Sequence, residues 1–159
     1  MFYVVAWPLL AEADDTALRR LRAQYHPREA ALIGPHFTLV FGAADDERER
    51  LEGALAQLAG RRPFWFVLDR VVRHDAYLYA TPGDGGERLA ALYDELNPAG
   101  GTEPFEPHIT LGHFANAAQA EQVARIVERQ HLPMHGRVEE LALLTRNGDA
   151  LDIVATVRL

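Results

Sequence analysis

The sequence contains no cysteine. Disulfide bonds, thiolate nucleophiles and zinc or iron–sulfur sites built on cysteine are therefore excluded. The sequence also lacks any apolar run close to the roughly 20 residues that span a membrane. The apolar N-terminal stretch has no basic segment before it, as a signal peptide would, and Pro8 interrupts it. We therefore expect a cytoplasmic protein with no membrane partner.

An excess of basic residues is also missing. Lys and Arg together number 16 against 23 Asp and Glu, which gives a formal net charge of −7. A general basic surface for long duplex nucleic acid is therefore not expected, although a local cleft can still hold one small or terminal anionic group. The length of 159 residues, with 48% apolar and 25% charged residues, is typical of one globular domain. We expect this domain to be a monomer.

Hydrophobic periodicity predicts a chain that alternates between strands and helices. Aromatic and β-branched runs indicate strands at 2–7, 35–42, 64–72, 76–80, 107–112, 138–144 and 151–159. Apolar residues three and four positions apart indicate helices at 13–25, 45–59, 87–96 and 117–130. On the first helix, Leu18 and Leu21 form the apolar face, and Arg19, Arg20 and Arg22 are placed on the outside.

One short motif occurs twice, as Pro-His-Phe-Thr-Leu at 35–39 and as Pro-His-Ile-Thr-Leu at 107–111. Side chains two positions apart on a strand point to the same face. The His and the Thr of each copy therefore share one face, and the apolar residues point to the other. The two polar pairs are His36 with Thr38 and His108 with Thr110.

The motif belongs to a longer internal repeat. The two motif His residues lie 72 positions apart, and Arg73 and Arg146, each just before a predicted turn, lie 73 apart. Both halves, at about 35–82 and 107–159, run from motif strand to helix, strand, turn and strand. We therefore expect one two-lobed domain over 1–159, with the lobes related by a pseudo-two-fold axis and the motif strands lining a central cleft.

Two His residues that face one cleft can divide a proton-transfer reaction. A neutral imidazole takes a proton from water or a hydroxyl, and a protonated one gives a proton to the leaving oxygen. Two Thr hydroxyls nearby can bind the non-bridging oxygens of a phosphate. Either His alone would more often be a hydrogen-bonded core residue, but the matched pair with two Thr favours catalysis or phosphate binding. No pair of carboxylates or phosphate-binding glycine loop accompanies the motif.

Two His-x-Thr-Leu strands in duplicated halves resemble the two-histidine (2H) phosphoesterase superfamily, in particular its 2′-5′ RNA ligase-like branch. The resemblance covers essentially the whole chain. It implies a bilobal α+β fold, with two antiparallel sheets flanked by helices, and a metal-independent enzyme without a cofactor. The substrates it implies are 2′,3′-cyclic phosphates or 2′-5′ linkages of RNA. It also implies His36 as general acid, His108 as general base, and Thr38 and Thr110 as phosphate-binding residues.

The chain departs from this family at one position. Many members carry an Arg two residues past the Leu of the second motif, where this chain has His113. Strict alternation turns His113 away from the cleft unless the strand ends or bulges at Gly112. A metal site formed by His108, His113 and another His matches no recognised ligand spacing, and we expect no metal.

Other side chains are weaker candidates for substrate contacts. Residues considered at the site are His113, Phe114, Arg73 and Arg146, and residues considered for stacking on a base are Phe41, Tyr77, Phe114 and those at 64–66. The leading hypothesis is hydrolysis of a 2′,3′-cyclic phosphate on a nucleotide or an RNA 3′ end. One alternative is cleavage or joining of 2′-5′ phosphodiester bonds. Another is a non-catalytic module that binds a nucleotide or a phosphate.

Overall fold

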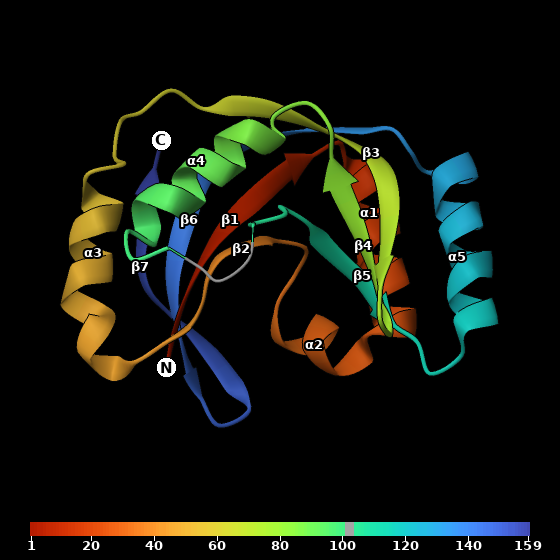
Figure 1. Ribbon diagram of the computed structural model, residues 1–159, viewed down its shortest axis with the longest axis horizontal. Coiled ribbons are helices and arrows are strands. Elements are labelled where there is room, and N and C mark those ends of the chain that lie inside the picture. The colour runs from red at the N-terminus through yellow and green to blue at the C-terminus, as the bar shows by residue number, and fades with distance from the viewer. Residues whose placement is uncertain (101–103) are drawn as a thin grey trace.

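A curved antiparallel sheet forms the centre of the protein in the computed structural model, which describes residues 1–100 and 104–159 (Figure 1). Within these residues the sheet has seven strands: β1 (Phe2–Leu10), β2 (Phe37–Ala43), β3 (Phe64–His74), β4 (Tyr77–Pro82), β5 (Ile109–His113), β6 (Met134–Asn147) and β7 (Ala150–Arg158). Their order is β2-β1-β6-β3-β4-β5, and β7 pairs with β6 beside this path. The expected α+β class is confirmed.

Helices cover the sheet and connect its strands. They are α1 (Glu12–Tyr25), α2 (Pro27–Leu32), the 3₁₀ helix η1 (Asp45–Glu47), α3 (Arg48–Ala56), α4 (Gly86–Leu96) and α5 (Ala117–Gln130). The helix predicted at 45–59 divides into η1 and α3, and α2 is not predicted by the sequence pattern. Pro27 ends α1, but proline also suits the first turn of a helix, where no partner for its missing N–H is needed. A second helix therefore begins at Pro27.

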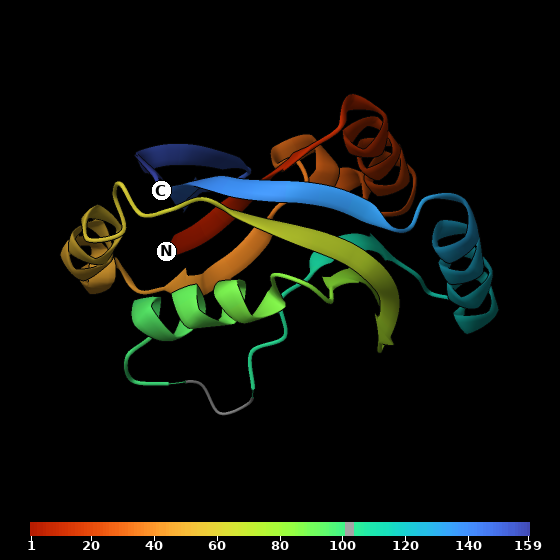
Figure 2. The same cartoon turned by 90° about the horizontal axis from the view of Figure 1, so that it is seen from above.

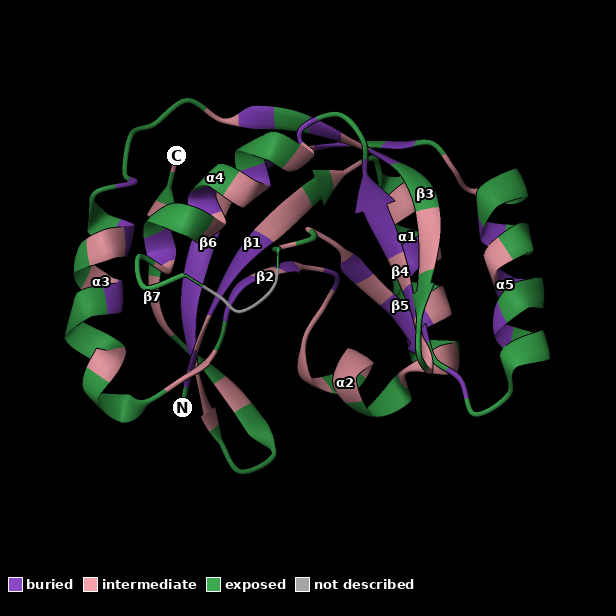
Figure 3. Cartoon of the chain, in the orientation of Figure 1, coloured by how far each residue is buried: buried purple, intermediate pink, exposed green. Residues whose placement is uncertain are grey.

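The helices divide between the two ends of the sheet. α3 contacts β6 and β7 and α4 contacts β2, whereas α1 contacts β5 and α5 contacts β3 and β4. Figure 2 shows α3 and α4 at one end of the molecule and α1 and α5 at the other. Figure 3 shows that buried residues concentrate on the strands between these helices. Each end of the sheet with its helices forms one lobe, and each lobe draws on both sequence halves: α3 packs on β6 and β7, and α5 packs on β3 and β4.

The strand order is symmetric about the pair formed by β6 and β3. When β1, β2 and β6 are matched with β4, β5 and β3, the order is the same from either end, and β2 and β5 take equivalent edge positions. The strands of the two lobes do not form separate sheets as expected, because β6 has 14 residues. It pairs with β3 over 134–138 and with β1 over 136–145, which joins both lobes in one hydrogen-bonded sheet.

Arg73 and Arg146 have the same contact in the two hairpin turns. Arg73 Nε donates a hydrogen bond to the carbonyl oxygen of Asp75, and Arg146 Nε donates one to that of Gly148. Asp75 and Gly148 both have a positive φ, of 50° and 62° respectively. The equivalent spacing of the two Arg in the sequence is thus matched by equivalent turn geometry.

The core beneath the first motif depends on a close approach at Gly136. Phe37, which follows the motif His, packs edge to face on Phe66 with 5.1 Å between ring centroids. Phe66 in turn lies directly opposite Gly136 in the β3–β6 pairing. A Cβ atom at position 136 would overlap the ring of Phe66 and would stand 2.8 Å from the side chain of Leu10. Only glycine leaves room for this ring.

We expect Gly136→Ala to lower the free energy of unfolding by about 1–3 kcal/mol, the usual cost of overpacking a core. Gly53→Ala is the matched control, because Gly53 is exposed on α3 and a Cβ there meets nothing within 4 Å. In a helix interior this control should raise stability by roughly 0.5–1 kcal/mol. Urea unfolding of both variants measures the difference, and equal effects of the two substitutions would contradict the proposed packing.

Candidate active site

The two motifs lead into the edge strands of the sheet. β2 begins at Phe37 and β5 at Ile109. Each motif His therefore stands one residue before its strand, and not within the strand as predicted. Phe37 and Ile109 are both 0% exposed in the core. Because neighbouring side chains on an extended chain point to opposite faces, burial of these two residues turns the adjacent His and Thr away from the core.

One pocket of about 600 Å³ brings the four predicted motif residues together. His36 and Thr38 line it from the first motif, and His108 and Thr110 line it from the second. All four side chains are partly buried. Two segments 72 positions apart in the sequence therefore contribute to the same pocket.

The two His rings have matching anchors. Nδ1 of His36 lies 2.8 Å from the carbonyl oxygen of Gly34, and Nδ1 of His108 lies 2.8 Å from the carbonyl oxygen of Glu106. A carbonyl oxygen only accepts hydrogen bonds, so Nδ1 carries the proton in both rings. In the neutral ring Nε2 then has a free lone pair, and in the protonated ring it is a donor. Each Nε2 can therefore accept or give a proton.

Burial favours the neutral form of both rings in the free protein. The pKa of His36 is lowered to about 4, mainly by burial; the bond to Gly34 opposes this change, and the positive charge of Arg22 adds to it. Burial also lowers the pKa of His108, against the effect of its bond to Glu106. An anion placed near the rings would raise both pKa values, because it stabilises the protonated form.

Aromatic side chains support the second His. Tyr79 stacks on His108 with 4.0 Å between ring centroids, and Tyr77 stacks on Tyr79 at 6.0 Å. Both Tyr side chains also line the pocket. Tyr79 is not among the site residues predicted from the sequence. Its position two residues from Tyr77 on a predicted strand could have indicated it, because this spacing places both side chains on one face. On the first motif, Trp7 meets His36 edge to face at 6.3 Å.

A bulge brings His113 to the face of these Tyr residues. The β4–β5 pairing shifts register between Tyr79, opposite Thr110, and Leu78, opposite Gly112, which leaves one extra residue on β5. His113 then lies opposite Tyr77, and their ring centroids are 4.8 Å apart. His113 is exposed, however, and does not line the pocket.

Two further candidates lie away from the pocket. Phe114 is 4% exposed and packs on Tyr25 with 4.9 Å between ring centroids, so it is a core residue and not a substrate contact. Arg73 is exposed at its hairpin turn and does not line the pocket. Arg146 does line it, as do Phe41 and Tyr77 among the residues considered for stacking on a base.

Arg22 lies where the sequence pattern did not place it. It is predicted on the outside of the first helix, but it is only 2% exposed. Nη1 donates a hydrogen bond of 2.7 Å to the carbonyl oxygen of Thr110, and Nη2 donates one of 2.9 Å to that of Ile33. The spacing in the sequence already indicated a buried position, because Arg22 follows Leu18 by four residues and therefore lies on the same face of the helix. The prediction of an outward Arg22 is wrong.

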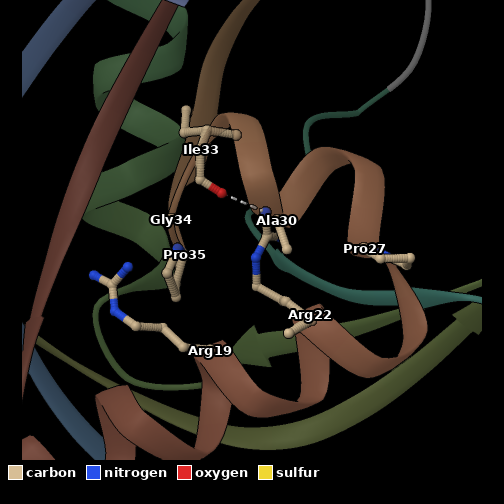
Figure 4. A pocket seen from close by; sticks show the side chains of 8 residues that line it. Arg19, Arg22, Pro27, Ala30, Ile33, Gly34 and Pro35 are labelled. Carbon is tan, nitrogen blue, oxygen red and sulfur yellow. Dashed lines mark hydrogen bonds between the residues drawn. The ribbon is translucent and has the colours of Figure 1, made fainter.

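Arg22 also borders a smaller pocket of about 380 Å³ behind the first motif. Figure 4 shows its side chain reaching from α1 toward Ile33, with Arg19, Gly34 and Pro35 around the same space. Gly34 is also the residue whose carbonyl anchors His36. The segment before the first motif is thus held between Arg22 on one side and the catalytic candidate His36 on the other.

The described residues contain no group of three or more His, Asp or Glu side chains placed to hold a metal ion. Among the helices they form, none is both long and apolar enough to cross a membrane.

Known proteins provide an independent comparison. The family model of the 2′-5′ RNA ligase superfamily matches residues 9–150. No curated protein sequence matches. The fold is similar to that of E. coli LigT crystallised with ATP, at a TM-score of 0.65 and 20% identity over 99% of this chain and 96% of LigT. It is also similar to TT0787 of Thermus thermophilus, at a TM-score of 0.60 and 21% identity over 100% of this chain and 98% of TT0787. The fold is similar to that of Usb1 of Kluyveromyces marxianus as well, at a TM-score of 0.59 and 12% identity over 99% of this chain and 97% of Usb1.

The family match and the fold likeness both extend over nearly the whole chain. They agree with the resemblance that the two motifs carry in the sequence, which is thereby confirmed. The chain belongs to the 2′-5′ RNA ligase superfamily of two-histidine phosphoesterases.

Proposed function

We propose that this protein is a metal-independent phosphodiesterase that hydrolyses the 2′,3′-cyclic phosphate of a nucleotide or an RNA 3′ end. One observation carries the proposal. His36 and His108 line the same pocket, each with Nδ1 bound to a backbone carbonyl and Nε2 left for proton transfer. Two imidazoles arranged in this way supply a general acid and a general base to one reaction.

The chemistry needs one proton to be taken and one to be given. His108 Nε2 accepts a proton from water as the water oxygen bonds to phosphorus. The bond from phosphorus to the 3′ oxygen breaks, and protonated His36 gives its Nε2 proton to that oxygen, which leaves a 2′-phosphate. Thr38 and Thr110 donate hydrogen bonds to the non-bridging oxygens, where negative charge develops. The assignment of acid and base follows the family resemblance.

The nucleotide ligands of related structures support the substrate class. Structures of E. coli LigT are known with 3′-AMP and with NADP⁺, and a structure of Kluyveromyces marxianus Usb1 is known with uridine monophosphate. In this chain, Tyr79 and Tyr77 border the pocket beside His108, and Phe41 borders it on another strand and is 84% exposed. Aromatic rings of this kind can stack on a base without selecting a sequence.

A second candidate function is supported by Arg146. Arg146 lines the pocket from β6, whereas the motif residues come from the segments at β2 and β5. A cation at this separate position suits the additional nucleotide of a 2′-5′ linked substrate. Cleavage or joining of 2′-5′ phosphodiester bonds would use the same two His residues.

Loss of either motif His should reduce turnover strongly. We expect His36→Ala and His108→Ala each to lower kcat for a 2′,3′-cyclic mononucleotide by roughly 10²–10⁴, because each removes one proton-transfer group. His135→Ala is the control, since His135 is exposed on β6 and does not line the pocket. Near-normal turnover in both motif variants would refute the proposed function. Tight nucleotide binding by the wild-type protein without product would instead indicate a binding module.

The pH dependence should be bell-shaped. The acid His36 must be protonated, so activity falls as the pH rises through its pKa. The base His108 must be neutral, so activity falls as the pH drops through its pKa. In the free protein the pKa of His36 is lowered to about 4 and that of His108 is also lowered, and a bound phosphate raises both. We therefore expect the alkaline limb of kcat to lie at higher pH than that of kcat/KM. Coincident alkaline limbs would contradict this shift.

The two substrate classes can be separated through Arg146. If the enzyme acts on 2′-5′ linkages, Arg146→Gln should reduce kcat/KM for a 2′-5′ dinucleotide several-fold more than for a cyclic mononucleotide. If the cyclic phosphate alone is the substrate, the wild-type protein should strongly prefer the cyclic mononucleotide and the substitution should change its kcat/KM little. Arg73→Gln is the matched control at the equivalent turn, because Arg73 makes the same backbone contact away from the pocket.

A further inference from the structure

We propose that Arg22 is the cation that holds the substrate's phosphate between the two motifs. The proposal rests on the proposed function only in identifying the anion as a substrate phosphate. It concerns a residue on α1, outside both motifs. The position of its guanidinium, between the segment before the first motif and the backbone of the second, carries the argument.

Arg22 is in contact with both halves of the site. Its Nη1 binds the carbonyl oxygen of Thr110 within the second motif, and its Nη2 binds that of Ile33, three residues before His36. The same side chain lines the pocket that contains all four motif residues. The guanidinium is therefore placed where the two motifs meet, close enough for its charge to lower the pKa of His36.

The charge of Arg22 has no direct counter-ion among residues 1–100 and 104–159. No carboxylate oxygen among the described residues lies within 4.0 Å of its nitrogens, and Glu29, which also lines the pocket, acts on it only at longer range. Burying an ion is expensive unless it is paired, and arginine does not lose its proton in proteins. An anionic ligand in the open pocket would therefore strongly stabilise this buried guanidinium.

Arg22 has donors left for such a ligand. A guanidinium has five N–H groups, and its fork matches the geometry of phosphate oxygens. Two of the five are used by the carbonyls of Ile33 and Thr110, and the hydrogen bonds of the described residues use no others. His113 is not placed for this task, because it is exposed beyond Tyr77 and outside the pocket lining.

The charge and the hydrogen bonds of Arg22 can be tested separately. Arg22→Gln keeps an amide donor and removes the charge, whereas Arg22→Lys keeps the charge and loses the fork. We expect Arg22→Gln to weaken binding of inorganic phosphate by at least 10-fold, measured by calorimetry, and to raise the pKa of His36 in an NMR titration. Arg22→Lys should retain phosphate affinity within a few-fold. Equal phosphate affinity of Arg22→Gln and wild type would overturn the proposal.

Two controls separate charge from packing. Arg19→Gln removes an equal charge one turn away on α1, where Arg19 is exposed and paired with Asp15, and should leave phosphate affinity unchanged. Asn97→Ala removes a neutral contact of the same kind, from Asn97 to the carbonyl oxygen of Leu39 on the other edge strand. A loss of phosphate affinity in Asn97→Ala as large as in Arg22→Gln would assign Arg22 a structural role only and overturn the proposal.

Two measurements on the wild-type protein complete the test. If Arg22→Gln does not fold, the Nε and Nη resonances of Arg22 are followed during a phosphate titration. A saturable shift supports the proposal, and no shift at saturating phosphate overturns it. Phosphate binding is also independent of turnover. If the wild-type protein hydrolyses no cyclic nucleotide, the proposed function is refuted. If Arg22→Gln nevertheless loses phosphate binding, the role of Arg22 as a phosphate-binding residue stands.

Discussion

The pairing of β6 with β3 is the contact on which the site depends. These strands stand at the middle of the sheet, so their hydrogen bonds set the position of one lobe relative to the other. The motif strands β2 and β5 each lie two strands away from this pair, at opposite edges. In the proposed reaction His36 and His108 must both reach the reacting atoms within hydrogen-bond distance, so a small change of twist at the centre of the sheet would move one of them out of reach. The close approach of Phe66 to Gly136 lies within this pairing and fixes its geometry.

The scaffold is symmetric, but its charge is not. On each edge strand a side chain from outside the sheet donates a hydrogen bond to a backbone carbonyl: Asn97, just after α4, to that of Leu39 on β2, and Arg22, on α1, to that of Thr110 on β5. These contacts satisfy edge carbonyls that would otherwise be open to pairing with another strand. Because one contact is neutral and the other is charged, two equivalent His residues have unequal surroundings. The charge of Arg22 lowers the pKa of His36, which opposes the acid role proposed for that residue until a bound phosphate raises the pKa again.

Local patterns predicted most of the fold and the four motif residues that meet in one pocket. The repeated His-x-Thr spacing was sufficient because alternation along a strand is a local rule, and burial of Phe37 and Ile109 then leaves the polar residues on the pocket side. The remaining features depend on contacts between distant segments. Burial of Arg22 requires β5 to lie against α1, and the orientation of His113 requires an extra residue in the β4–β5 pairing. Neither contact follows from periodicity within one element.

The charge distribution limits the substrates that this pocket can hold. The net charge of −7 repels a polyanion at long range, and salt reduces this repulsion over a Debye length of about 8–10 Å. Attraction must therefore arise inside the pocket, at short range. The chain contains no lysine, so every side chain that is positively charged at all ordinary pH values is a guanidinium. Arg22 and Arg146 are the two that line the large pocket among the described residues. Two cations in an acidic protein match a ligand with one or two phosphates far better than a long RNA strand.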